Sequence, residues 1–220
     1  MKIRFSFGCR LIANSRPRTA SNTVSTPIVH APTASLAEAL SWLDIKAGPE
    51  TEYATELWRL CTKWGVDPTI LFAQWARETG DGSSARWRVF NPAGLGVEQD
   101  SDGNPGIKNG REAAVIHVWA MLMLGERSFV YEDSLPIGSL AFTKRWRQKT
   151  TDGTCPDAIT IADLGKRYVD STGEPQAVWG WDANYANGIV SKLNSIFPNR
   201  PHEVTPVSTI VAEPCPIETY

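Results

Sequence analysis

The turn at residues 65–68 constrains the fold of this chain more than any other feature of its sequence. Before the turn, apolar residues recur at intervals that place them on one face of a helix: Tyr53, Leu57, Leu60, Cys61 and Trp64. Gly65 is suited to ending that helix, because glycine readily adopts the left-handed backbone that follows a helix C-terminus. Asp67 and Pro68 are typical of an N-cap and a first helical residue. The sequence therefore predicts two helices joined by a short turn, the second continuing to about Glu78.

Helical spacing continues through the central part of the chain and predicts a mainly α (α+β) fold. A short helix is expected between Ser35, a suitable N-cap, and about Lys46. Further helices are expected over 111–124, over 159–168 and from Asp182 onward, where apolar residues again fall on one face.

Residues 81–110 have a different character. They are rich in glycine and aspartate and contain Asn-Pro pairs, which are typical of turns. We expect a small irregular β-lobe in this region, with short extended pieces near 88–90 and 95–97.

The two ends of the chain lack helical periodicity. Residues 1–34 are rich in Ser, Thr, Pro and Arg, which indicates a flexible N-terminal arm. Residues 199–220 contain several prolines and no apolar pattern, so we expect a Pro-rich tail. A single domain is left between them, over residues 35–198.

Composition disfavours several classes of function. The net charge of −2 gives no basic stripe of the kind that nucleic-acid-binding proteins carry. Two of the three histidines lie in the predicted arm and tail, so a zinc amidase is poorly supported and we expect no cofactor. A peptidase that pairs Cys61 with His117 is also disfavoured, because both residues fall on apolar helix faces. No apolar run has the length of a membrane span or a signal-peptide core, so we expect no membrane partner.

Glu78 is the residue that indicates chemistry. It is expected at the end of an apolar helix, directly before a glycine-rich turn. The partial negative charge of the helix C-terminus and desolvation beside Trp75 would both favour the protonated form of its carboxyl group. A glycosidase needs such an acid, protonated near neutral pH, to donate to the leaving oxygen. Most Glu residues at helix ends are solvated, however, so this pattern alone does not assign the role.

Three segments of the chain carry a family resemblance. They are the turn Glu78-Thr79-Gly80 with the helix before it, the stretch Phe90-Asn91-Pro92-Ala93-Gly94-Leu95-Gly96, and the start of the last predicted helix at Asn184-Tyr185. In this order and spacing, over about residues 35–197, they resemble the bacterial and phage glucosaminidases of the lysozyme superfamily (mannosyl-glycoprotein endo-β-N-acetylglucosaminidase-like).

The resemblance implies a lysozyme-like helical domain that hydrolyses the glycan strands of peptidoglycan, with no nucleic acid partner. It implies Glu78 as the general acid and Tyr185 as a catalytic residue that faces the sugar. Glu98 is the preferred second carboxylate, ahead of Asp100 and Asp102. The substrate-binding residues would be Trp75, Phe90, Asn91, Gly94 and Asn184.

Several alternatives stay open at this level. A muramidase or a lytic transglycosylase could use the same fold, and substrate-assisted attack by the N-acetyl group would need no second protein carboxylate. A non-catalytic wall-binding or virion module is also compatible with the sequence. If the chain degrades cell walls, the lack of a signal peptide suggests a monomeric lysis protein that is cytoplasmic until released, or a virion-associated one.

Overall fold

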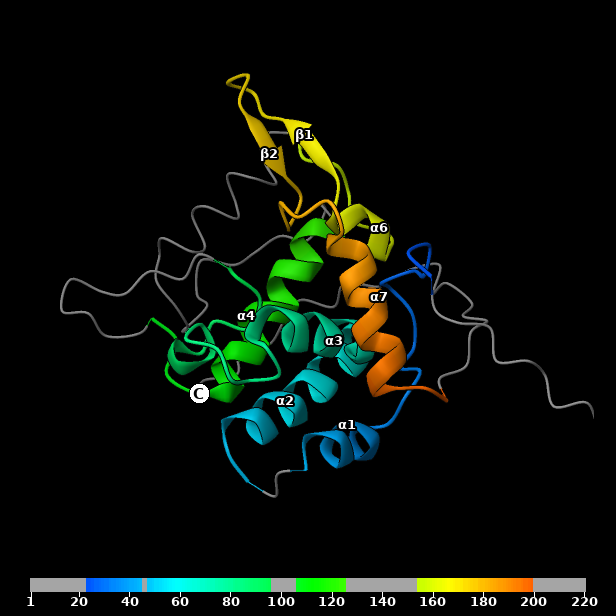
Figure 1. Cartoon of the computed structure of the whole chain (residues 1–220), viewed down its shortest axis with the longest axis vertical. Coiled ribbons are helices and arrows are strands. Elements are labelled where there is room, and N and C mark those ends of the chain that lie inside the picture. Colours follow the sequence, from blue (N-terminus) through cyan, green and yellow to red (C-terminus); the bar gives the residue numbers. More distant parts are fainter. Residues whose placement is uncertain (1–22, 45–46, 96–105, 126–153, 200–220) are drawn as a thin grey trace, which may run out of the picture.

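The computed structural model describes residues 23–44, 47–95, 106–125 and 154–199, and these form a mainly helical domain (Figure 1). The helices are α1 (Leu36–Leu43), α2 (Pro49–Trp64), α3 (Pro68–Thr79), α4 (Gly110–Gly125), α6 (Ile161–Leu164) and α7 (Tyr185–Ile196), with the 3₁₀ helix η1 (Trp87–Val89). A two-stranded antiparallel sheet pairs β1 (Arg167–Val169) with β2 (Pro175–Ala177). The mainly helical prediction is confirmed.

The predicted turn between α2 and α3 is confirmed. Gly65 adopts the left-handed conformation, with φ 70°, and its N–H donates to the carbonyl of Cys61. The Asp67 side chain accepts a hydrogen bond from the Thr69 N–H at 2.9 Å, and Pro68 is the first residue of α3. Local side-chain chemistry therefore fixes where α2 ends and where α3 begins.

Helix α3 is the centre of the domain (Figure 1). Residues 68–76 of this helix are all buried. Helix α7 packs along α3, and α2 packs against both α3 and α4. The start of α4 comes so close to α2 that a Cβ on Gly110 would lie 1.9 Å from the carbonyl oxygen of Pro49.

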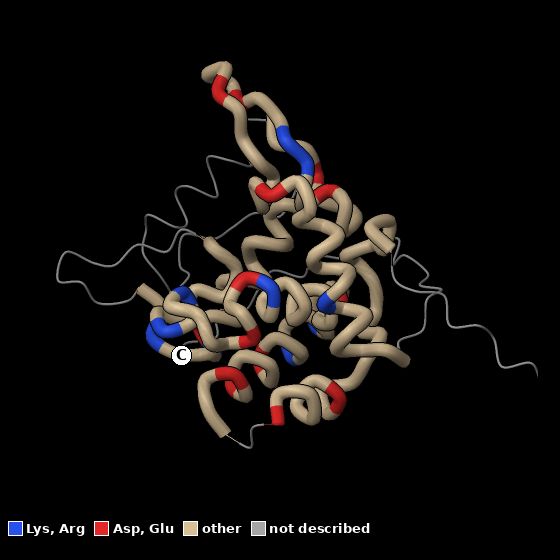
Figure 2. Tube along the Cα trace, viewed as in Figure 1, with Lys and Arg blue, Asp and Glu red and all other residues tan. Residues whose placement is uncertain are grey.

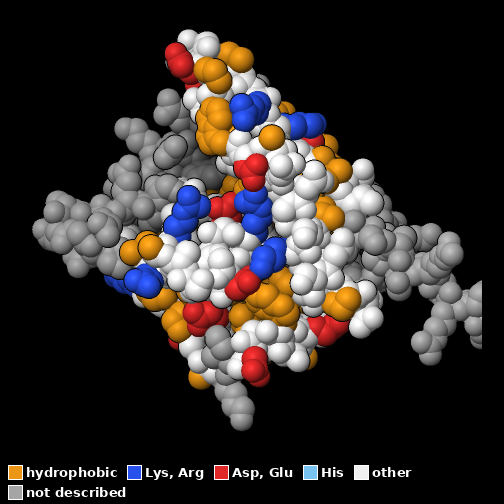
Figure 3. Space-filling model, in the orientation of Figure 1, with side chains coloured by type: hydrophobic (Ala, Val, Ile, Leu, Met, Phe, Trp, Pro, Cys, Tyr) orange, Lys and Arg blue, Asp and Glu red, His pale blue; other side chains and the backbone are white. Residues whose placement is uncertain are grey.

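Charged residues of both signs are interspersed over the described part of the chain (Figure 2). On the face drawn in Figure 3, acidic and basic side chains lie next to one another near the middle of the molecule. Among the described residues, no helix has both the length and the apolar character needed to cross a membrane.

The expected β-lobe is not where the sequence predicted it. Residues 88–90 form the end of η1 and a left-handed Phe90 (φ 53°) instead of an extended piece. Among the described parts of 81–110 there is no strand, and the piece expected near 95–97 lies mostly outside the described residues. The Asn91 side chain closes a turn by accepting from the Leu95 N–H at 2.9 Å, which agrees with the turn that the Asn-Pro pair predicted.

The sheet lies instead in a hairpin that projects from the helical body (Figure 1). The helix predicted over 159–168 is limited to α6, and the chain turns into β1 soon after it. The Asp170 carboxylate sets the hairpin turn by accepting the N–H groups of Thr172 (2.9 Å) and Glu174 (3.0 Å). Strands of only three residues, half of them exposed, are too short to show an alternating apolar pattern, and so the sequence did not reveal them.

The predicted flexible arm is wrong for residues 23–34. Ile28 is buried, and its backbone bonds to Ile159 on one side and to Asp67 on the other, at 2.9 and 3.0 Å. His30 is also fully buried, with Nε2 3.3 Å from a carboxylate oxygen of Asp67. This segment was missed because its ordering depends on partners far away in the sequence. Residues 1–22 and 200–220 lie outside the described residues.

Replacing Ile28 with alanine tests this correction. Loss of a buried isoleucine side chain should lower the free energy of unfolding by about 2–4 kcal/mol, because a cavity replaces it. The measurement is urea unfolding. Ile159→Ala is the matched control, since its side chain is 62% exposed and its backbone bond to Ile28 is kept. Equal, small effects of the two changes would show that the segment does not belong to the core.

Candidate functional site

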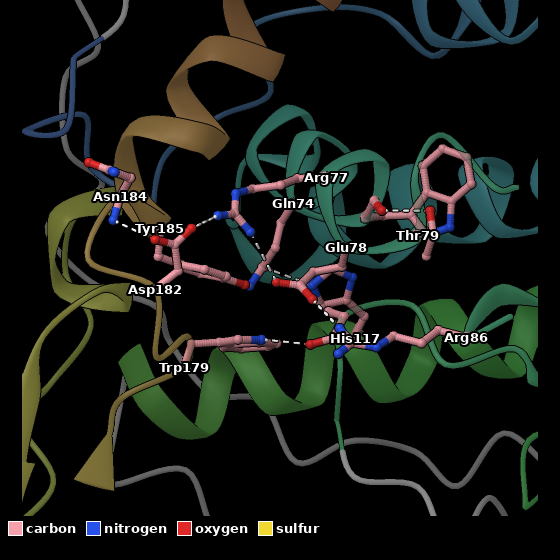
Figure 4. A network of polar contacts seen from close by, with 12 residues as sticks. Gln74, Arg77, Glu78, Thr79, Arg86, His117, Trp179, Asp182, Asn184 and Tyr185 are labelled. Carbon is pink, nitrogen blue, oxygen red and sulfur yellow. Dashed lines mark hydrogen bonds and ion pairs between the residues drawn. The ribbon is translucent and has the colours of Figure 1, made fainter. Parts of the chain in front are cut away.

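The candidate site surrounds Glu78 in the last turn of α3 (Figure 4). Gly80 ends the helix with φ 57°, so the chain turns away directly after Glu78. The Glu78 side chain is only 10% exposed. A carboxyl group that is nearly buried, but still reaches solvent, lies at the end of the central helix as the sequence predicted.

Two guanidinium groups contact this carboxyl. Arg86 Nη1 lies 2.7 Å from Glu78 Oε2, and Arg77 Nη1 lies 3.6 Å from Oε1. The sequence predicted a nearly buried carboxyl at a helix end, but it did not predict these two ion pairs.

The turn after η1 packs directly against the carboxyl group. A Cβ on Gly94, which has φ 66°, would lie 3.4 Å from both Glu78 Oε2 and Arg86 Nη1. The bond from Leu95 N–H to the Asn91 side chain holds this turn closed. Gly94 therefore lies beside Glu78, and Asn91 belongs to the same turn.

Tyr185 approaches Glu78 from α7. Its ring is buried, and its hydroxyl accepts a hydrogen bond from Gln74 Nε2 at 2.9 Å. Burial raises the pKa of this phenol well above its usual value, and the charge of Glu78 and a hydrogen bond to it raise it further. The hydroxyl is therefore a proton-bearing donor that faces Glu78, whereas the sequence-based hypothesis placed Tyr185 against a sugar.

A buried hydrogen-bond chain extends from Tyr185 into the core (Figure 4). Gln74 Oε1 lies 2.9 Å from His117 Nε2, and His117 Nδ1 lies 2.7 Å from the Tyr53 hydroxyl. Because Gln74 donates to Tyr185 through Nε2, its Oε1 must accept from His117. His117 then accepts from Tyr53, so every donor in the chain points toward Glu78.

His117 can serve as a neutral member of this chain. Burial lowers its pKa from 6.5 to about 3, so the imidazole is uncharged at neutral pH. The sequence suggested simple core packing for His117 and gave no role to Gln74. The apolar pattern of one helix cannot reveal that His117 contacts Gln74, which is 43 positions away along the chain, and Tyr53, which is 64 positions away.

Arg77 is held in place by Tyr185 on α7 and by Asp182, which precedes this helix in the chain. It pairs with Asp182, and its guanidinium lies 4.6 Å from the centre of the Tyr185 ring. The side chain can lie there because Gly188 leaves room: a Cβ at that position would be 2.1 Å from Arg77 Nε. Gly180 similarly makes room for the Tyr185 ring, 2.1 Å from where its Cβ would be. Neither glycine stands out in the sequence, because the side chains that need the space come from distant positions in the chain.

Trp75 does not take the place expected of a substrate-binding residue, whereas Phe90 and Asn184 keep exposed surface and their binding role stays a prediction. Trp75 is fully buried, with its ring centre 5.4 Å from those of Tyr53 and Trp87, so it is a core residue and not a sugar platform. Phe90 is half-buried and packs on Trp87. Asn184 is the exposed N-cap residue of α7, without a side-chain capping bond.

The acidic loop that contains the proposed second carboxylate, Glu98, with Asp100 and Asp102, lies outside the described residues. Within the described ranges, no group of three or more His, Cys, Asp or Glu side chains is arranged to hold a metal ion. The described part of the site offers the Glu78 carboxyl, with Arg77 and Arg86 on it, the Tyr185 phenol, and Asp182 as the second partner of Arg77.

Comparison of the chain with family models, with curated proteins and with solved structures gave no match. The resemblance inferred from the sequence is consequently neither supported nor contradicted by a relative.

Gly188→Ala tests whether α7 positions the site. The new Cβ would clash with Arg77 and displace it from Asp182, and overpacking of this kind should lower the free energy of unfolding by about 1–3 kcal/mol. Urea unfolding measures this. Gly165→Ala is the control, since the nearest atom to its Cβ would be 3.6 Å away and its φ is −93°. An unchanged stability in Gly188→Ala would contradict the close approach of Arg77.

The buried neutral state of His117 predicts a pH dependence of stability. In the unfolded chain His117 binds a proton below pH 6.5, whereas in the folded protein it does so only below about pH 3. Stability should therefore fall as the pH drops through this window, by about 1.4 kcal/mol per pH unit relative to a variant without the group. Unfolding free energies of the wild type and of His117→Gln, measured between pH 7 and about pH 4, check this. Parallel curves for the two proteins would show that folding does not lower the pKa of His117.

Proposed function

We propose that this protein is a glycoside hydrolase that cleaves the glycan strand of peptidoglycan, as an endo-β-N-acetylglucosaminidase with a lysozyme-like fold and Glu78 as the proton donor. The observation that carries the proposal is the enclosure of one carboxyl group by three separate elements. Glu78 at the end of α3 is bordered by the turn at Gly94 and by the hydroxyl of Tyr185 on α7. The order of these segments is the same as in the sequence resemblance.

In this proposal Glu78 donates its proton to the glycosidic oxygen while the bond from that oxygen to the anomeric carbon breaks. Water adds its oxygen to the anomeric carbon, and its proton goes to a base, so that each product ends in a hydroxyl group. With Glu98 as the second carboxylate, that base is Glu98. In the substrate-assisted alternative, the N-acetyl carbonyl oxygen first bonds to the anomeric carbon as the leaving oxygen departs; water then displaces it and gives its proton to the ionised Glu78. Tyr185 acts on Glu78 by donating a hydrogen bond to its carboxylate, and the buried chain through Gln74 and His117 keeps this donor oriented.

A non-catalytic wall-binding module is the second candidate. The observation in its favour is the pairing of Glu78 with two arginines, since a general acid must carry a proton before it can donate one. Muramidase and lytic transglycosylase activities use the same acid and differ in the product that they leave.

Glu78→Gln separates the enzyme from the module. If Glu78 is the general acid, the variant should digest purified peptidoglycan at least about 100-fold more slowly than the wild type. Glu174→Gln, an exposed residue of the projecting hairpin, is the matched control and should digest at the wild-type rate. Mass spectrometry of the products identifies the bond: a reducing N-acetylglucosamine supports the proposal, a reducing muramic acid indicates a muramidase, and an anhydro end indicates a transglycosylase. Binding to walls without digestion by either wild type or variant would establish the module.

A further inference from the structure

We propose that Arg86 is a specificity residue: it binds a carboxylate of the substrate and, in doing so, releases Glu78 from its ion pair. The enzyme would then prefer glycans that carry carboxylates over neutral N-acetylglucosamine polymers. This inference rests on the proposed function, because it concerns the substrate of the same site.

The two arginines that contact Glu78 differ in how firmly they are held. Arg77 is 22% exposed and is fixed by Asp182 and by the Tyr185 ring. Arg86 is 59% exposed, and among the described residues its only side-chain partner is Glu78. The two side chains reach the carboxyl group from different directions (Figure 4). Arg86 is therefore the arginine that can move.

The backbone of Arg86 is anchored although its side chain is not. Its carbonyl accepts the N–H of Asn91 at 3.0 Å and that of Val89 at 3.3 Å. A guanidinium has five N–H donors, and a single contact through Nη1 leaves most of them available to solvent or to a ligand. Arg86 therefore has an anchored backbone and a guanidinium that can move and has unpaired donors, and this combination suits the binding of a carboxylate at the edge of the site.

The charges around Glu78 make this exchange useful for the proposed reaction. The groups that face the carboxyl are Arg77 on its own helix, Arg86, the backbone of Gly94 and the hydroxyl of Tyr185. Arg77 already shares its charge with Asp182. When a substrate carboxylate binds Arg86, Glu78 loses its 2.7 Å ion-pair partner and its carboxyl group is free to contact the glycosidic oxygen.

A neutral glycan offers Arg86 no competing anion, so the pair with Glu78 persists. The incoming carboxylate replaces Glu78 as the partner of Arg86, so the guanidinium stays paired during the exchange. In peptidoglycan the carboxylate comes either from the lactyl group of muramic acid or from the stem peptide, and both have the same chemistry toward a guanidinium.

Arg86→Gln tests the proposal on two classes of substrate. One is a neutral N-acetylglucosamine hexamer, and the other is a soluble peptidoglycan strand, prepared with and without its stem peptides. Loss of the guanidinium should raise kcat/KM on the neutral hexamer and lower it on the strand, so that the ratio falls about tenfold. Arg86→Lys keeps the charge without the fork of donors and should retain part of the preference.

Arg88→Gln is the matched control. Arg88 lies on η1 two positions further along the chain and is likewise exposed, but no ion-pair partner is found for it among the described residues. This variant should keep the wild-type ratio. An Arg86→Gln effect confined to the peptide-free strand would assign the carboxylate to muramic acid, and one confined to the peptide-bearing strand would assign it to the stem peptide.

The outcomes separate this inference from the proposed function. If digestion depends on Glu78 but the ratio is the same in wild type and Arg86→Gln, the role of Arg86 is overturned and the enzyme stands. If the wild type digests nothing, isothermal titration calorimetry with the same two substrate classes decides. A preference for the acidic strand that is lost in Arg86→Gln then supports carboxylate recognition without catalysis, and equal binding of both classes overturns it.

Discussion

The burial of α3 is the constraint on which the rest of the structure depends. Residues 68–76 of this helix are buried, with α2 and α7 packed against it. Only its last turn reaches the surface, where Arg77 and Glu78 are partly exposed. The packing that stabilises the domain therefore also determines where a single carboxyl group emerges, and which other segments can border it.

Opposing electrostatic effects meet at that carboxyl group. The helix C-terminus and the nearly buried position disfavour a charge, whereas two guanidinium groups favour one. One of these cations is tied to α7 and the other is largely in solvent. The ion pair with the exposed arginine is therefore the one that a ligand can reach.

The sequence predicted the helices well because their signals are local. Asp67 and Gly65 act within a few residues of their own positions, and the capping box of Ser35 at the start of α1 is equally local. The hairpin and the ordered segment at 23–34 were not predicted, because neither has a periodic apolar pattern. Their stability comes from a turn carboxylate in one case and from distant backbone partners in the other.

The sequence by itself determined the helical class, the α2–α3 turn and the position of Glu78 at a helix end, since each follows from residues close together along the chain. Only the tertiary structure decided what surrounds Glu78. Trp75 lies in the core, the Tyr185 hydroxyl faces the carboxyl, and Gly188 admits Arg77, because helices more than 100 residues apart in sequence pack together there. The physical reason is that capping and periodicity act over one or two helical turns, whereas ion pairs and buried hydrogen-bond chains join whichever side chains the packing brings within reach.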